Sequence, residues 1–181
     1  MKLKHFAALG AGFALAFSGC TTTKSGGVAY DAAAGATIVT GKQTTIAPLA
    51  GAVRTVFLKA EMSPGDTELF LVVLYLSANG GLSAEDVRDS SGARFQALTG
   101  GNETIPIQSG QVTKEIYYIP LTTRYLEKHR HSGIQIRLKG PNGAVVAVQS
   151  PSLVTGFLSD VHATKTKLAS GVTIKKLVQA R

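Results

Sequence analysis

Residues 69–76, with the sequence LFLVVLYL, are the most apolar stretch of this 181-residue chain beyond residue 20. The apolar residues follow one another without alternation, and turn-forming residues bound them at Gly65-Asp66 and at Asn79-Gly80-Gly81. Eight residues between two turns are too few for a typical buried helix, but they suit a strand that is covered on both faces. We therefore expect this strand to lie at the centre of the hydrophobic core.

Hairpins are predicted next to this strand and further along the chain. Residues 53–62 alternate between apolar and polar side chains, and Pro64-Gly65 then supplies the two central residues of a turn. Residues 134–138 alternate in the same way, and the sequence GPNG at positions 140–143 turns them into a partner strand. Further strands are expected around the polar turn at 89–92 and at 114–119, whereas 102–109 are predicted to be a loop.

Two helices are predicted among these strands. Residues 121–132 begin beside Thr122, which can cap a helix, and end before Gly133, which suits a helix terminus. Residues 152–161 form a second, shorter helix in this interpretation. The fold class expected for residues 37–160 is therefore all-β, a sandwich of about seven to nine short strands with one or two small helices. The alternative is an α+β fold in which both helices cover one sheet.

The first twenty residues are typical of an export signal. Lys2 and Lys4 precede an apolar run of twelve residues, 6–17, which is too short to cross a bilayer as a helix. The sequence Phe17-Ser18-Gly19-Cys20 ends the run with small side chains and with the single cysteine of the chain. A lone cysteine also excludes an intramolecular disulfide.

The residues Phe17-Ser18-Gly19-Cys20 resemble the lipobox of bacterial lipoproteins. The resemblance implies that residues 1–19 are removed as a signal peptide and that Cys20 carries fatty-acyl groups such as palmitate. Because residue 21 is Thr and not Asp, the resemblance favours the outer membrane on its periplasmic side, with the inner or cell membrane as the alternative. Residues 20–36 are rich in Thr, Gly and Ala without periodicity, so we expect them to be a flexible tether.

Positive charge is concentrated near the C-terminus. Removal of residues 1–19 leaves 17 Lys and Arg against 11 Asp and Glu, a formal charge of +6. Beyond Asp160 there is no acidic residue, and five cations follow, namely Lys165, Lys167, Lys175, Lys176 and Arg181. Residues 161–181 are therefore interpreted as a basic tail that touches an anionic lipid or envelope polymer. The alternatives are a solvated terminus without a role and, for Val172, Ile174 and Lys176, a paired strand.

Two clusters of polar residues contain side chains of the types that bind metal ions. His129 and His131 lie beside Arg130 and Lys128, which would repel a dication, and residues two apart on a helix point in different directions. A second cluster, with oxygen ligands suited to calcium, consists of Glu85, Asp86, Asp89 and Ser91, but its spacing matches no complete calcium loop. No metal ion and no cofactor is therefore expected.

The function predicted from these features is a lipid-anchored periplasmic module that binds or positions another envelope component. Nucleic acid is excluded as a partner because the chain is exported. The alternative function is a small envelope hydrolase with a site assembled from loops. The sequence does not favour it, because no Gly-x-Ser-x-Gly motif is present and the histidines after residue 20 are confined to His129, His131 and His162.

Overall fold

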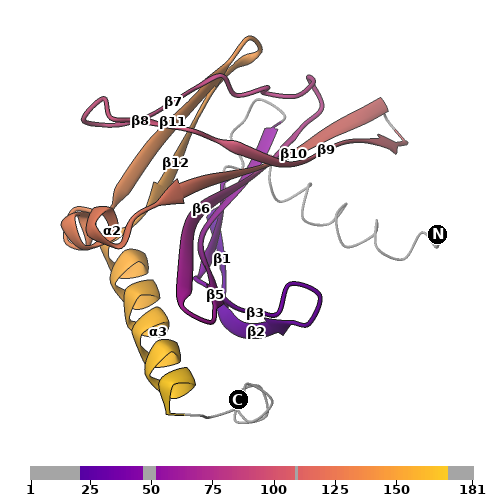
Figure 1. Ribbon diagram of the computed structural model, residues 1–181. Helices are drawn as coiled ribbons and strands as arrows, with labels where there is room; N and C mark the ends of the chain where they lie inside the picture. The colour runs from indigo at the N-terminus through magenta and orange to yellow at the C-terminus, as the bar shows by residue number, and fades with distance from the viewer. Residues whose placement is uncertain (1–20, 47–51, 109, 171–181) are drawn as a thin grey trace.

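The computed structural model describes residues 21–46, 52–108 and 110–170. In these residues the chain forms two antiparallel sheets, one of eight strands and one of four, and two helices (Figure 1). The predicted fold class is confirmed, although the strands outnumber the seven to nine that were expected. The small sheet lies across one end of the large sheet, and the longer helix runs alongside the large sheet (Figure 1).

Three strands of twelve residues each form the centre of the large sheet. They are β5 (Ala52–Ser63), β6 (Asp66–Ser77) and β10 (Gly110–Leu121). β6 lies between the other two, and residues 69–73 are buried on both faces, which confirms the predicted central strand. The β5–β6 hairpin turns at Pro64-Gly65, where Gly65 has a φ of 86°, a conformation that favours glycine. The strand expected at 114–119 is longer at both ends, because β10 runs from Gly110 to Leu121.

The two edges of the large sheet were predicted wrongly. β9 (Leu98–Ile107) pairs with β10 where a loop was expected. At the other edge β3 (Ala36–Thr40) and β4 (Gln43–Ile46) both pair with β5. The expected tether instead contributes two strands, β1 (Thr21–Lys24) beside β4 and β2 (Gly27–Asp31) beside β3. These strands escaped prediction because an edge strand is held by backbone pairing, which requires no periodicity of side chains.

The small sheet contains the two other predicted strand pairs, which flank the turns at 89–92 and at 140–143. Its order is β12 (Gly143–Gln149), β11 (Ile134–Gly140), β7 (Asp86–Asp89) and β8 (Arg94–Phe95). Ile134, Ile136 and Leu138 are at most 1% exposed, while the residues between them are exposed, so the predicted alternation is confirmed. This sheet therefore has one apolar face and one face directed to solvent.

Both predicted helices are present, but their lengths differ from the expectation. α2 (Thr123–His129) is capped by the Thr122 hydroxyl, which accepts the N–H of Tyr125 at 3.1 Å. α3 (Pro151–Ala169) was expected to end at residue 161. It continues because Val154, Phe157, Val161 and Thr164 are all buried, at spacings that form one helical stripe. The boundary expected near Asp160, between domain and tail, thus lies inside a helix.

One hydrophobic cluster joins the two sheets and α3. It includes Leu71 of β6, Ile136 of β11 and Phe157 of α3, all at most 2% exposed. The buried Gln149 amide adds a polar link by donating to the Val56 carbonyl at 3.0 Å, which ties β12 to β5. The face of the large sheet that contributes to this cluster is called the inner face below, and the opposite one the second face.

Candidate functional site

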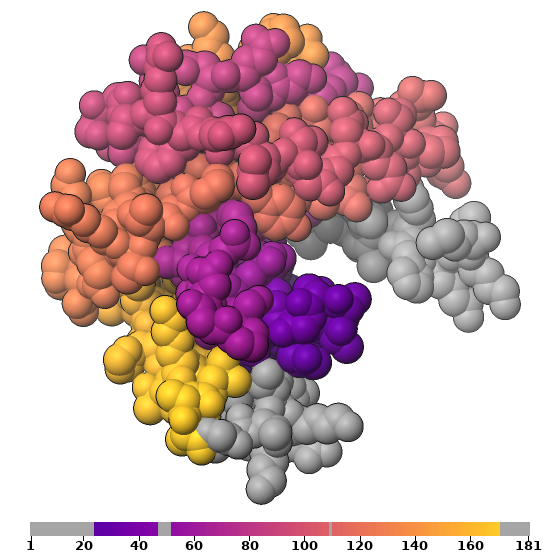
Figure 2. Space-filling model, in the orientation of Figure 1, coloured from indigo at the N-terminus to yellow at the C-terminus, as the bar shows by residue number. Residues whose placement is uncertain are grey.

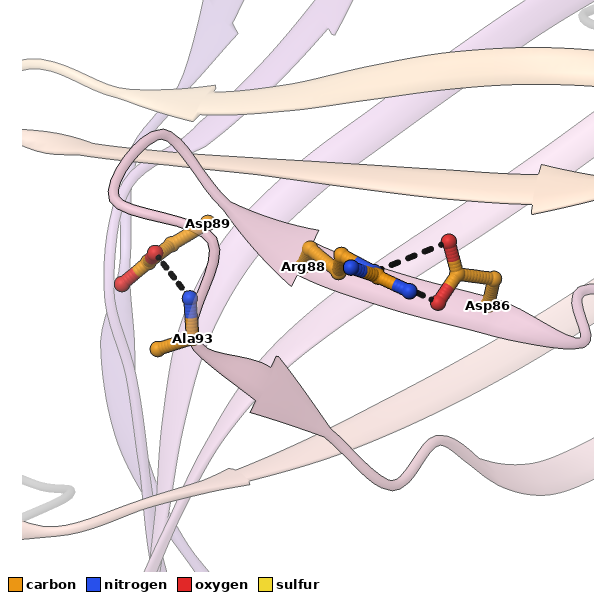
Figure 3. Close-up of polar contacts among 4 residues, drawn as sticks. All are labelled: Asp86, Arg88, Asp89 and Ala93. Carbon is orange, nitrogen blue, oxygen red and sulfur yellow. Dashed lines mark hydrogen bonds and ion pairs between the residues drawn. The ribbon is translucent and has the colours of Figure 1, made fainter.

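The Asp89 carboxylate accepts the hydrogen bonds that hold the acidic turn at residues 89–93. One oxygen, Oδ1, accepts the N–H and hydroxyl of Ser91 at 2.9 and 2.7 Å. It also accepts the N–H of Ala93 at 3.0 Å (Figure 3). The other oxygen accepts the Tyr125 hydroxyl at 3.1 Å. Burial opposes ionisation of this carboxyl, but the hydrogen bonds outweigh it and lower the pKa of Asp89. Asp89 is therefore a fixed structural anion.

Asp86 lies on the opposite face of β7 from Asp89. Arg88 Nε donates to both oxygens of the Asp86 carboxylate, at 2.8 and 3.1 Å (Figure 3). The hydrogen bond and charge of Arg88, with Arg94 and Lys139 nearby, hold the pKa of Asp86 below its usual value. Because Asp86 and Asp89 point to different faces, the acidic cluster seen in sequence does not converge on one ion.

One group of described residues contains the side-chain types of a hydrolytic site. It consists of Asp89, Ser91, Tyr125 and His129. The rings of Tyr125 and His129 lie 4.2 Å apart, and burial, followed by the charge of Asp89, raises the pKa of Tyr125. Ser91, however, donates to a carboxylate, and His129 Nδ1 contacts the Tyr125 carbonyl at 2.9 Å. These contacts contain no hydrogen bond between a nucleophile and a base, which acyl transfer would require.

The histidines do not assemble a metal site in the part of the chain that the structure describes. His129 and His131 lie at the end of α2 and just beyond it. Among residues 21–46, 52–108 and 110–170, no group of three or more His, Cys, Asp or Glu is arranged to hold a metal ion.

A buried carboxylate that sequence reasoning missed holds the connection between the two sheets. Glu115 of β10 is 2% exposed and accepts the backbone N–H groups of Leu82 and Ser83, the second at 3.1 Å. The neighbouring Tyr117 hydroxyl accepts the N–H of Ala84 at 3.1 Å, and burial raises the pKa of Tyr117 to about 12. In sequence Glu115 stands in an ordinary polar position, so no local signal could have identified it.

The second face of the large sheet lies opposite the core cluster and carries one apolar row, with charged residues such as Lys59 and Lys114 beside it. One transverse row across four strands consists of Phe57, Val72, Tyr118 and Leu98. Leu98 is 45% exposed and Phe57 and Tyr118 are partly exposed, whereas Val72 in the middle of the row is buried. The Lys59 ammonium lies over the Tyr118 ring, 5.2 Å from its centroid. Beside this row, β9 pairs only with β10 among the described residues, so its other backbone edge is available to an added strand.

The residues proposed from sequence to meet a membrane are only partly described. Lys165 and Lys167 lie exposed on α3, whereas Cys20, Lys175, Lys176 and Arg181 fall outside the described residues, as does the alternative strand at 172–178. Within the described part, neither helix is long and apolar enough to cross a membrane.

Comparison of the chain with protein-family models, with curated proteins and with solved structures found no match.

Proposed function

We propose that this chain is a lipid-anchored, non-enzymatic module of the bacterial envelope that binds another envelope protein. The edge of β9, with the apolar row beside it, is the observation that carries the proposal. Strand addition at a sheet edge gives affinity through backbone hydrogen bonds, and exposed apolar residues beside the edge give specificity. The partner therefore has an extended segment with apolar side chains.

The features of β9 support this use. The pairing of residues 101–105 with residues 112–116 of β10 is uninterrupted, and the register shift of the ladder lies beyond it, next to Tyr117. The only charged side chain of β9, Glu103, lies opposite Lys114, 3.5 Å away, so it is partly neutralised. An edge with few charges in its middle is poorly protected against pairing with another chain.

The binding surface is tested by capture of partners from solubilised envelopes with the acylated protein and site-specific cross-linking. Leu98→Glu adds a charge to the apolar row at a position that is already half exposed, so the fold should tolerate it. Tyr30→Glu, on β2, is the matched control because Tyr30 is 53% exposed and lies at the opposite edge. We expect Leu98→Glu to lose the captured protein and Tyr30→Glu to retain it; equal capture by both variants would contradict the proposed surface.

The anchor is tested separately. Cys20→Ala should abolish metabolic labelling with a tagged fatty acid, because no other residue of the chain supplies the thiol to which the lipid is joined. Labelling that persists in this variant would exclude the lipoprotein assignment without bearing on the β9 surface.

A further inference from the structure

Three arginines form one transverse row on the solvent-facing side of the small sheet. Arg88 of β7 lies directly opposite Arg94 of β8 on one side and Arg137 of β11 on the other. Neighbouring strands are about 4.8 Å apart, so these three residues, called the arginine row below, span roughly 10 Å. Arg94 and Arg137 are exposed, and the Arg88 side chain is 41% exposed.

The arginine row lies in a positive field. The next transverse row contains Lys139 opposite Asp86, and Asp86 is the single carboxylate on this face of the paired strands. The hydrogen bond from Arg88 is the main cause that lowers the pKa of Asp86, and the charges of Arg88, Arg94 and Lys139 lower it further. Like charges directly opposite one another destabilise a sheet. Arg88 forms an ion pair with Asp86 at 2.8 Å, whereas Arg94 and Arg137 form no ion pair among the described residues, so these two arginines are the ones open to an anionic partner.

Acidic residues gather at the opposite end of the molecule. Glu61 and Glu68 lie opposite one another near the β5–β6 turn, Asp66 begins β6 at that turn, and Asp31 ends β2 beside β3. Figures 1 and 2 show the small sheet at the top of the molecule, β2 and the β5–β6 turn below it, and the end of α3 lower still. Residues 20–160 carry 12 Lys and Arg against 11 Asp and Glu. This near-neutral total includes the end of the molecule that carries the arginine row, called the basic end below, and the end that carries these four carboxylates, called the acidic end below.

The chain enters the fold at the basic end. Thr21, the first described residue, belongs to a transverse row that crosses the large sheet to Glu115 of β10. The row consists of Thr21, Ile46, Arg54, Tyr75 and Glu115. Glu115 is the residue that holds the connection to the small sheet. Since β1 begins at residue 21, a lipid on Cys20 would be separated from this end of the sheet by a single peptide bond.

We infer that the outer face of the small sheet binds the phosphate groups of anionic lipid head groups. Arginine suits this role because its planar guanidinium donates paired hydrogen bonds to phosphate oxygens. The inference rests on the proposed function for the anchor that brings this face to a membrane. With that anchor, the basic end faces the lipid, and the acidic end and Lys165 and Lys167 of α3 lie away from it.

The test uses an unlipidated chain of residues 21–181, so that its outcome does not depend on acylation. This chain retains the whole core, because every residue of the hydrophobic cluster and of the partly buried shell lies between Val28 and Leu168. Binding is measured by co-sedimentation with vesicles of phosphatidylglycerol and phosphatidylethanolamine, with phosphatidylcholine vesicles as the neutral comparison. Thermal unfolding of each variant confirms that the fold is retained.

Two double variants remove the same charge from opposite ends. Arg94→Gln with Arg137→Gln should weaken binding at low salt by up to about 25-fold, since each cation near an anionic surface contributes about 1 kcal/mol. Lys165→Gln with Lys167→Gln should change it by less than about twofold, because these lysines lie at the far end of α3.

Three results would overturn the inference. The first is loss of binding with the lysine variant instead, or equally with both, and the second is absence of vesicle binding by the parent chain. The third is binding of soluble polyphosphate alone, without binding to vesicles. None of these results bears on whether Cys20 is acylated.

Discussion

Removing the Glu115 carboxylate tests whether one buried anion holds the two sheets in their arrangement. In Glu115→Ala the N–H groups of Leu82 and Ser83 lose their acceptor. Leu82 is 1% exposed, so its N–H would be left unsatisfied at a cost of about 1–3 kcal/mol. Ser83 is exposed and can turn to water, which limits its share to about 1 kcal/mol. The free energy of unfolding should therefore fall by about 2–4 kcal/mol.

Equilibrium unfolding in urea of residues 21–181 measures this loss. With a slope of about 2 kcal/mol per molar urea, the midpoint should fall by about 1–2 M. Glu115→Gln is the control, because its amide oxygen still accepts one hydrogen bond, and we expect roughly half the loss. An Ala variant within about 0.5 kcal/mol of the parent would refute the view that this carboxylate secures the connection.

A double-variant cycle with Gly81 makes the test more specific. A Cβ at Gly81 would lie 2.6 Å from Glu115 Oε1, so Gly81→Ala should destabilise the parent. The same substitution should cost less when Glu115 is Ala, since the obstructing carboxylate is gone. Additive effects of the two substitutions would show that they do not meet in the native fold.

Two further predictions concern the core and the end of α3. Leu71→Asp should prevent folding because Leu71 is 0% exposed. Leu74→Asp lies on the second face, where Leu74 is partly exposed, and should lower the thermal midpoint only modestly. Equal loss of stability in both variants would mean that the second face is covered in the native protein. A chain that ends after Asp160 should be less stable by about 2–4 kcal/mol because it loses the buried Val161 and Thr164, whereas one that ends after Ser170 should match the parent. An unchanged urea midpoint for the shorter chain would restore the view that residues beyond 160 are a separable tail.

Local patterns in the sequence were sufficient to predict the elements whose composition, turn or cap is encoded within the element itself. The strand at 69–76 follows from an apolar run between turns, the hairpin of β11 and β12 from alternation around GPNG, and the start of α2 from Thr122. The hairpin of β11 and β12 and the cap of α2 are formed by hydrogen bonds between neighbouring residues, and the strand at 69–76 is marked by its own apolar composition. The fold class could therefore be predicted without a template.

The edge strands and the surfaces could not be predicted in this way. β1, β2 and β9 exist because β4, β3 and β10 offer them unpaired backbone groups, and those partners are chosen by the tertiary fold. The length of α3 depends on the inner face of the large sheet, which buries residues beyond Asp160.

The sequence by itself determined the apolar central strand, the main turns, the single cysteine and the total charge. Only the tertiary structure decided where the charges lie. Arg88, Arg94 and Arg137 are separated by as many as 49 positions in the chain, yet cross-strand pairing places them in one row, while the carboxylates of the β5–β6 end gather far from them. Net charge is a property of composition, but an electric field depends on distance, and distance is set by the register of the strands.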